Sequence, residues 1–331
     1  MAVIAVSYHK SVNVLQEANM AAVGPFDSWQ WFRFLSEDSE NNLLFCVAIE
    51  GDAMAALPLR QSAGRLDALT NWYAFAWRPL RTHGAKLPPL AEAMARDLKS
   101  HARRIVLAPL PDEDGTASLL EKAFRQAGWI VFRDPYDVNH VLDIGGRSYV
   151  EYLATRPGPL RTTLARKAKK VSVDIFLSFE DDAWSSYEEI YAKSWKPAEG
   201  DPAFLKRFAQ AEGAAGRIRL ALACHEGKPV AAQFWTVEHG TAYIHKLAHL
   251  PEAGKLSAGT TLTAALMEQV IDRDRVERID FGTGNDSYKA DWMEAVRPRF
   301  RLDCHDPRRV ASWPHIARGA LRRLASRKSA G

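Results

Sequence analysis

Alternation between apolar and polar stretches is clearest in the second half of the chain. Three apolar runs between Ile218 and Leu250 are separated by short polar turns that contain glycine. Such runs are typical of β-hairpins, so the sequence predicts a three-stranded antiparallel meander. Leu262, Leu266 and Val270 then recur every four residues, which predicts a helix with one apolar face. The apolar run 276–282 predicts a further strand, and we expect it to lie parallel to its neighbour because a helix precedes it.

The first half repeats this order in a diverged form. The pattern predicts a hairpin over 43–61, a third strand over 65–72, a helix over 87–102, a strand over 104–110 and a helix over 115–129. We interpret the two halves as a duplication. The predicted fold class is therefore α/β (α+β): two tandem modules, each with a mixed, mostly antiparallel sheet flanked by helices.

Length and composition support a division into domains. The chain has 331 residues, of which 47% are hydrophobic and 25% charged, and this favours about two ordinary globular domains. Prolines and a glycine interrupt the pattern within 152–161. We expect an N-terminal domain over 1–150, a C-terminal domain over 151–305 and a basic tail over 306–331.

The composition also disfavours several classes of protein. Cys46, Cys224 and Cys304 are widely spaced, so neither a disulfide framework nor a zinc site is expected, and we expect no metal. No apolar run approaches the roughly 18 residues needed to span a bilayer. The first residues lack the pattern of a secretory signal. These features favour a cytoplasmic protein.

The loop before the predicted helix at 262–270 has the character of an anion site. A helix that begins near Gly259 presents free backbone N–H groups, and small neighbouring residues allow a phosphate to approach the backbone closely. An ordinary Ser or Thr helix cap is the alternative interpretation. The equivalent loop of the first half has Pro88 and Pro89 where those donors are needed. A phosphorylated cofactor is therefore expected in the second module.

Two segments are strongly basic. Residues 156–170 hold six Lys or Arg, which favours an anionic substrate, although a solvated helix surface is an equally plain interpretation. Residues 308–328 hold seven, and Ile316, Ala320 and Leu324 fall on one helical face. This tail is expected to contact an anionic membrane surface or to pack on the domain. Few aromatic residues accompany these charges, and we expect no DNA partner.

Several segments together resemble a known family. They are Ser194–Pro197 (SWKP), 229–235 (PVAAQFW), 242–248 (AYIHKLA), 256–267 (LSAGTTLTAALM) and 280–293 (DFGTGNDSYKADWM). These stretches resemble two-domain bacterial GNAT-family N-acyltransferases of the Fem-like type, which include enzymes associated with cellulose and exopolysaccharide synthesis. The resemblance covers about residues 150–305 well and the first half only as a pattern.

The resemblance implies an acyl-CoA co-substrate, most simply acetyl-CoA. Its pyrophosphate is expected at the helix start, on Lys255, Ser257, Ala258, Gly259, Thr260 and Thr261. The usual GNAT loop has an Arg or Gln and alternating glycines, whereas this one has Lys255 and a single central glycine. Fem-type relatives use aminoacyl-tRNA, which stays open as the alternative donor.

The resemblance also implies a catalytic group around the turn after 276–282. Tyr288 is expected to return a proton to the departing thiolate, Lys289 to hold the oxyanion or an acidic substrate group, and Asp286 to orient Lys289 or receive the amine proton. Asp280 and His245 are expected to line the same cleft. The expected substrate contacts are Gln233, Trp195, Arg161 and Lys167.

Each of these residues has a structural alternative. Tyr288 is alternatively a core tyrosine, Asp286 a helix N-cap, Lys289 a solvated lysine and His245 a hydrogen-bonded structural histidine. Asp280 needs a partner if it is buried, and Lys246 is a candidate.

The resulting hypothesis is an N-acyltransferase that acts by direct transfer on an amino group of a sugar, polysaccharide or cell-envelope precursor. The expected acceptor is an anionic amino sugar or a lipid-linked or nucleotide-linked small molecule. The protein is expected in the cytoplasm, at the inner face of the membrane if the tail at 308–328 binds lipid. The alternatives are an aminoacyl-tRNA-dependent transferase acting on a peptidoglycan precursor, with tRNA as a partner, and a catalytically silent binding protein.

Overall fold

The computed structural model describes residues 3–18, 20–37 and 42–328. The chain forms two compact units, one made of residues 1–137 with 297–331 and the other of residues 138–296. The units divide inside two long strands, β8 (Ile130–Asp143) and β14 (Ala295–His305). The boundaries placed at 150 and 305 from the sequence therefore do not coincide with the compact units, because each strand continues past the point where the packing partner changes.

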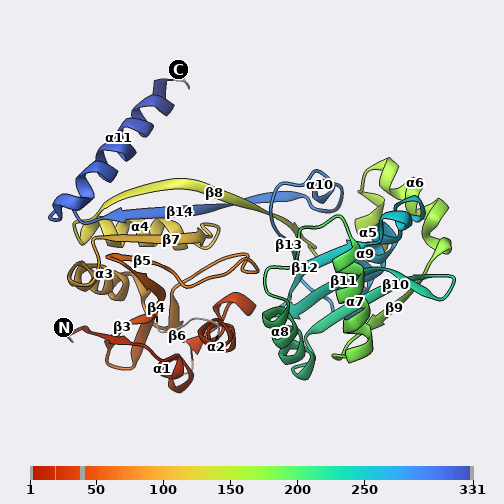
Figure 1. The fold of residues 1–331 in the computed structure, drawn as a ribbon, viewed down its shortest axis with the longest axis horizontal. Helices are drawn as coiled ribbons and strands as arrows, with labels where there is room; N and C mark the ends of the chain where they lie inside the picture. Colours follow the sequence, from red (N-terminus) through yellow and green to blue (C-terminus); the bar gives the residue numbers. More distant parts are fainter. Residues whose placement is uncertain (1–2, 19, 38–41, 329–331) are drawn as a thin grey trace. The chain divides into compact units, whose positions relative to one another are not determined.

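The first unit contains a mixed sheet with helices (Figure 1, red to yellow, with the blue C-terminal helix). Its sheet has the strand order β1-β3-β4-β5-β7-β14, and β6 pairs with β4 and with β2. Its elements are β1 (Ala5–His9), α1 (Asn13–Glu17), β2 (Met20–Ala21), α2 (Trp29–Glu37), β3 (Leu43–Glu50), β4 (Ala53–Ser62), β5 (Arg65–Ala68), β6 (Leu80–Thr82), α3 (Leu87–Asp97), the 3-10 turn η2 (Leu98–Ser100), β7 (Arg104–Leu110), α4 (Thr116–Gln126), the first part of β8, most of β14 and α11 (Trp313–Lys328).

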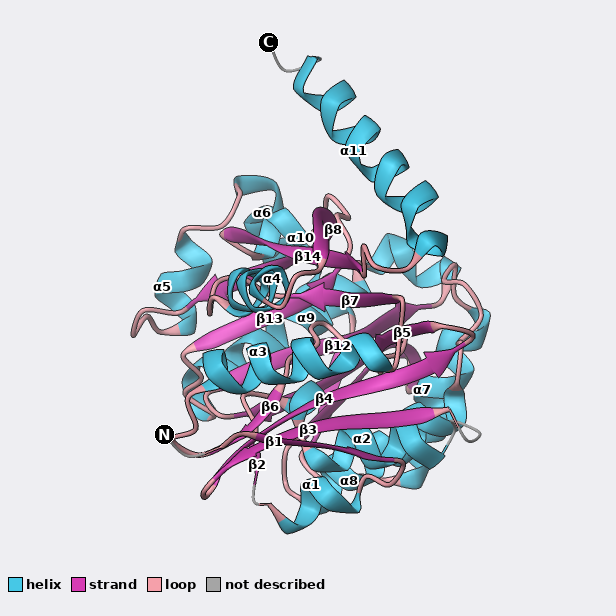
Figure 2. Cartoon of the chain, turned by 90° about the vertical axis from the view of Figure 1, so that its left-hand side faces the viewer, coloured by secondary structure: helices cyan, strands magenta, loops and turns pink. Residues whose placement is uncertain are grey.

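The order predicted for the first half is confirmed. Strands β3, β4 and β5 form an antiparallel meander, and β7 returns parallel to β5 through α3. Helix α3 contacts β3 and β4 and lies in front of these strands in Figure 2. It begins at Leu87 with proline in its first turn, so two of its first backbone positions carry no N–H donor.

The second unit repeats the arrangement in the chain from yellow-green to light blue (Figure 1). Its strand order is β8-β13-β12-β11-β10-β9. Its elements, besides the end of β8, are α5 (Tyr149–Ala154), α6 (Gly158–Lys167), β9 (Ser172–Phe176), α7 (Asp181–Lys193), α8 (Pro202–Ala214), β10 (Ile218–His225), β11 (Lys228–Glu238), β12 (Thr241–His249), the 3-10 turn η4 (Pro251–Leu256), α9 (Ala258–Glu268), β13 (Arg278–Thr283) and α10 (Lys289–Trp292).

The meander β10-β11-β12 and the parallel strand β13 are as predicted. Strand β12 pairs with β13 at only three positions, the last of which joins Tyr243 to Asp280. Both strands continue beyond that pair, β12 to His249 and β13 to Thr283. The two strands therefore separate beyond this pair.

The helices of this unit cover opposite faces of its sheet. Gln233 on β11 bonds to α9, whereas the next residue, Phe234, packs against Trp184 of α7 and Phe208 of α8. Adjacent strand residues point to opposite faces, so α9 lies on one side and α7 with α8 on the other. The buried core on the α9 side includes Trp235, Leu262 and Leu266. Within the described part of the chain, no helix is both long and apolar enough to cross a bilayer.

Candidate functional site

The N-terminus of α9 presents a set of backbone N–H donors without helical partners. Strand β12 ends at His249, the turn η4 follows, and Ser257 adopts a left-handed conformation with φ of 55°. The first helical hydrogen bond runs from Thr261 N to Ser257 O at 3.0 Å. The N–H groups of Ala258, Gly259 and Thr260 precede that bond, and the helix offers them no acceptor of its own. This end of α9 therefore carries partial positive charge.

Three side chains near this end of α9 have groups that suit an anion. Lys167, at the end of α6, places its Nζ atom 3.2 Å from the Oγ atom of Ser257. The Oγ1 atom of Thr261 is buried and finds no hydrogen-bond partner among the residues that the structure describes. Lys255 lies exposed on η4, one turn before the helix. A lysine, a row of N–H groups and an orphaned hydroxyl fit a phosphate group.

Gly259 is half-buried in the first turn of α9. A Cβ atom there would stand 3.4 Å from His249 Cδ2, which is a tight but not an overlapping contact. The His249 ring in turn packs at a tilt against the Trp195 ring, with ring centroids 4.3 Å apart, although Trp195 is 54% exposed. The predicted substrate contact Trp195 therefore lies beside the predicted cofactor loop.

Gln233 holds α9 in place. Its Nε2 atom donates to Gly259 O at 3.2 Å and to Thr263 Oγ1 at 2.6 Å, and its Oε1 atom accepts from Trp235 Nε1 at 2.9 Å. The side chain is buried. These bonds fix the first turn of α9 on β11, so the geometry gives Gln233 a positioning role.

Asp280 stabilises the exit from β13. Its buried carboxylate accepts from Asn139 Nδ2 at 3.1 Å and from Gly282 N at 2.8 Å. Gly282 and Gly284 have φ of 69° and 92°, which only glycine adopts at low cost, and this agrees with the sharp turn predicted there. The candidate partner Lys246 places its Nζ atom 2.8 Å from Glu199.

Tyr288 lies next to the point where the strands separate. Its ring makes an edge contact, at 5.7 Å, with Phe281, the first residue of β13 beyond the last pair with β12. Burial raises the pKa of the phenol well above its ordinary value, and the charge of Asp286 raises it further. Tyr288 is therefore protonated at neutral pH and is available as a proton donor.

Lys289 is buried, so the solvated alternative is wrong. Its ammonium group donates to Thr283 O and to Gly284 O. Asp286 is exposed and does not cap α10, whose N-cap position is Tyr288 with no side-chain bond. A Cβ atom at Gly284 would stand 3.8 Å from Lys289 Nζ and 3.9 Å from Asp286 Oδ2, so both charged groups face this glycine.

His245 belongs to the aromatic packing under α7 and α8. The register of β12 shifts at this residue, its ring stacks on Phe234 at 5.0 Å, and Nε2 lies 2.8 Å from Thr236 Oγ1. Burial, and then the charge of Lys246, lower the pKa of His245 to about 3. A base this weak does not take a proton from an ammonium group at neutral pH, which favours the structural alternative.

The basic segment 156–170 divides into two parts. Arg156 is buried, bonds to Glu294 and to Trp292 O, and is therefore structural. Arg161 is exposed on α6 with its Nε atom donating to Arg156 O at 3.1 Å. Only Lys167 of this segment reaches the start of α9 through a contact described above.

Two features were missed from the sequence. The end of β8 brings Asn139 to Asp280 and the buried His140 to Asn285, at 3.0 Å, in the turn before Tyr288. A cavity of about 360 Å³ is lined by residues of α7, the loop after it and α8, among them Trp184, Tyr187, Tyr191, Glu188 and Glu199. Neither has a local sequence signal, since both depend on which elements the fold brings together. No group of three or more potential metal ligands occurs within residues 3–18, 20–37 and 42–328.

Residues 151–290 match the family model described as an acetyltransferase (GNAT) domain. No curated protein sequence matches the chain.

Solved structures share the two-module architecture. FemX aligns with a TM-score of 0.63 at 9% identity over 90% of this chain and 96% of its own. L-PGS from Bacillus licheniformis aligns with a TM-score of 0.57 at 12% identity over 90% and 98%. A tandem GNAT protein from the clavulanic acid biosynthesis pathway aligns with a TM-score of 0.52 at 14% identity over 91% and 98%. At these identities the likeness establishes the fold alone, a mixed α/β protein with a large mixed sheet flanked by helices.

Proposed function

Starting from the GNAT acetyltransferase domain matched by residues 151–290, we propose that the second unit transfers an acyl group from acyl-CoA, most simply acetyl-CoA, to an amine. The observation that carries this proposal is the anion site at the start of α9, where Lys167 reaches Ser257 beside three backbone donors. The pyrophosphate of CoA is the group that such a site suits. Lys255, Ser257 to Thr261 and Lys167 would hold it.

Tyr288 is the proposed general acid. As the amine nitrogen bonds to the thioester carbon and the carbon–sulfur bond breaks, the phenol gives its proton to the leaving thiolate. The raised pKa of Tyr288 keeps the phenol protonated for this step. General acid catalysis of this kind is typically worth about 10²–10⁴ in rate.

Asp286 is the proposed acceptor of the amine proton, directly or through water. It is exposed at the turn that precedes Tyr288, and it shares the environment of Gly284 with Lys289. Lys289 donates to the carbonyls of Thr283 and Gly284, so its proposed role is to hold the turn that carries the two reacting groups. Asp280 supports the same turn through Gly282 N.

The proposed acceptor is an amine on a sugar or cell-envelope precursor that also carries negative charge. The carboxylates of Glu188 and Glu199 in the aromatic cavity lined by α7, the loop after it and α8 suit a cationic amine. Glu199 also contacts Lys246 on the part of β12 that has separated from β13. Arg161, Arg166 and Lys169 are exposed on and after α6, which packs against α9, and they suit a negatively charged group of a substrate.

Aminoacyl-tRNA is the alternative donor. The observation in its favour is that the basic residues of 161–170, apart from Lys167, lie largely on the surface, where a polyanion can reach them. The fold does not choose between the two donors.

The decisive experiment follows thiol release from acetyl-CoA by the full chain in the presence of glucosamine and of a nucleotide-linked amino sugar. Product mass spectrometry should show one added acetyl group on nitrogen. Tyr288→Phe should remove the activity without removing acetyl-CoA binding. If the protein binds acetyl-CoA but transfers no acetyl group to any amine tested, the result would contradict the enzyme proposal and favour a catalytically silent binding protein. Transfer from aminoacyl-tRNA in place of acetyl-CoA would establish the alternative.

A further inference from the structure

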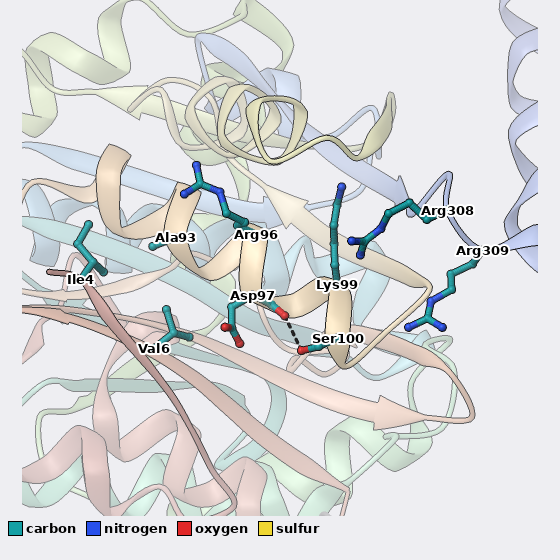
Figure 3. A pocket seen from close by; sticks show the side chains of 9 residues that line it. All are labelled: Ile4, Val6, Ala93, Arg96, Asp97, Lys99, Ser100, Arg308 and Arg309. Carbon is teal, nitrogen blue, oxygen red and sulfur yellow. Dashed lines mark hydrogen bonds between the residues drawn. The ribbon is translucent and has the colours of Figure 1, made fainter.

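The first unit contains a cationic cavity of about 770 Å³ that has no counterpart in the proposed reaction. It opens between the start of β1, the end of α3 with η2, and the segment that follows β14 (Figure 3). Four cationic side chains line it, together with one carboxylate, Asp97; they are Arg96, Lys99, Arg308 and Arg309. A cavity lined in this way is suited to an anion.

A second cavity, of about 430 Å³, adjoins the first. The two share Ser100, Arg308 and Arg309, and the second adds Arg103 and reaches Val310. The cationic surface thus runs from α3 along the segment that leads into α11. Lys99 and Arg308 lie side by side in Figure 3. Burial lowers the pKa of Lys99; the charge of Asp306 opposes this shift, and the charge of Arg308 adds to it.

Carboxylates offset only part of this charge. Asp306 accepts from Arg308 Nη2 at 2.9 Å and lies 4.0 Å from Arg309 Nε, and Glu92 pairs with Arg96 at 2.5 Å. Asp97 accepts from the Tyr8 hydroxyl at 2.5 Å. Three carboxylates therefore face five cations, which are Arg96, Lys99, Arg103, Arg308 and Arg309. The excess is positive, and the bonds of Asp306 orient the arginine side chains that border the cavity.

Helix α11 presents apolar side chains beside this cationic surface. The helix packs through Gly319, where a Cβ atom would stand 2.6 Å from the Phe132 ring, so no larger residue fits. Trp313 and Leu321 are left 61% and 66% exposed, and Ala317 between them is also exposed. The sequence had placed the apolar face on Ile316, Ala320 and Leu324. The structure shows Ile316 half-buried and Ala320 exposed, and the side chain of Leu324 lies outside the described residues.

Trp313 connects the cationic cavities to the exposed apolar side chains of α11. Its Nε1 atom donates to Pro307 O at 3.1 Å, immediately before Arg308 in the chain. Val310, between the arginines and the helix, is 83% exposed. An exposed tryptophan, leucine and valine next to arginines have the composition of a protein surface that enters the headgroup region of a bilayer. A purely electrostatic anion site does not require them.

We propose that this surface, made of Arg96, Lys99, Arg308, Arg309, Trp313 and Leu321, binds an anionic phospholipid membrane. The headgroup phosphate enters the cationic cavity, and Trp313 and Leu321 enter the interfacial layer. The proposal rests on the first unit alone. It therefore stands or falls independently of the acyl-transfer chemistry proposed for the second unit.

The test is flotation of the full chain with vesicles of phosphatidylcholine, with and without phosphatidylglycerol. Binding should require phosphatidylglycerol and weaken as sodium chloride is raised. Lys99→Gln and Arg309→Gln should each weaken binding about fivefold, the effect of one cation near a lipid surface. Trp313→Ser with Leu321→Ser should weaken it about tenfold with little change in folding, because both side chains are exposed. Lys122→Gln, an exposed charge on α4, is the matched control and should bind like the wild type.

Four results would overturn the proposal. The first is absence of vesicle binding, and the second is equal binding to neutral and anionic vesicles. The third is an equal loss of binding in Lys122→Gln and Lys99→Gln. The fourth is displacement of the protein from the vesicles by inorganic phosphate beyond the effect of sodium chloride at equal ionic strength; this result would assign the cavity to a small phosphorylated molecule. Binding of tRNA that Lys99→Gln abolishes, without vesicle binding, would assign the surface to nucleic acid. Acetyl-CoA titration of the same variants should match the wild type and so report on the second unit separately.

Discussion

The ammonium group of Lys167 lies 3.2 Å from the hydroxyl of Ser257, although the two residues are 90 positions apart. The contact places the last turn of α6 against the first turn of α9, inside the second unit. A fixed positive charge thereby stands at the end of a helix whose dipole already favours anions. This pairing is the physical basis for assigning the diphosphate of a co-substrate to this end of the unit.

Replacing Lys167 by glutamine should weaken acetyl-CoA binding about tenfold, since a charge-assisted hydrogen bond to phosphate contributes about 1.5–3 kcal/mol before solvent screening. The turnover number at saturation should change little, because the proposed contact of the lysine is with the diphosphate and not with the reacting atoms. Lys169→Gln removes an exposed charge two residues away and is the control. The measurement is the calorimetric Kd for acetyl-CoA of the wild type, Lys167→Gln and Lys169→Gln. Equal Kd values for the two variants would show that Lys167 does not belong to the binding site.

Replacing Tyr288 by phenylalanine should lower kcat by about 10²–10⁴ and leave the Kd for acetyl-CoA unchanged. Tyr149→Phe, which alters another partly buried tyrosine of the same unit, should retain activity. Activity within twofold of wild type in Tyr288→Phe would show that this phenol is not the acid.

The pH profile gives an independent check on Tyr288. Its acid form is active, and burial together with the Asp286 charge raises its pKa, so kcat should not fall until the pH passes the ordinary tyrosine range. Asp286→Asn removes the proposed proton acceptor, so kcat should be lower at every pH, and it also removes a negative charge that favours the protonated phenol. The alkaline limb of the residual rate should therefore move to lower pH in that variant, and an unmoved limb would contradict the assignment.

His245 should make unfolding pH-dependent. Its pKa falls to about 3 in the folded protein from an ordinary value of about 6.5, so the unfolded chain binds one more proton between these values. The stabilisation is complete above pH 6.5 and is lost as the pH falls toward 3, with a slope of at most about 1.4 kcal/mol per pH unit. Urea unfolding at several pH values measures the free energy of unfolding. In His245→Gln, this free energy should lack the pH dependence between about 3 and 6.5 that His245 causes. The exposed control His239→Asn should keep it, and an equal slope in all three proteins would be evidence against the buried neutral ring.

The sequence predicted those elements whose boundaries are marked locally. The meander β10-β11-β12 follows from apolar runs between glycine turns, and α9 follows from the spacing of Leu262, Leu266 and Val270. The same reasoning found β7 and the parallel return to β5 in the first half. Local pattern sufficed here because each element buries one regular face.

The sequence did not predict β8, a strand whose residues belong partly to the first unit and partly to the second. Its residues Arg133, Asp134 and Asp137 interrupt the apolar alternation, so nothing local indicates a strand that continues to Asp143. As a result, Asn139 and His140 were missed, although they support Asp280 and Asn285. The partner of Asp280 lies 141 residues earlier in the chain, and such a pairing is set by topology. Burial of Lys289 and His245 likewise depends on tertiary packing, which residue type alone does not reveal.

The central claim is that the start of α9 binds the diphosphate of acyl-CoA. Isothermal titration with acetyl-CoA and with free CoA tests it most directly, on the wild type, Gly259→Leu and the control Gly158→Leu. Gly158 is exposed, and a Cβ atom there would have no heavy atom within 4 Å, whereas Gly259 faces His249 at the mouth of the site. We predict saturable binding of both ligands by the wild type and Gly158→Leu, and affinity at least tenfold weaker in Gly259→Leu. Absence of binding by the wild type, or equal affinity in Gly259→Leu, would contradict the account.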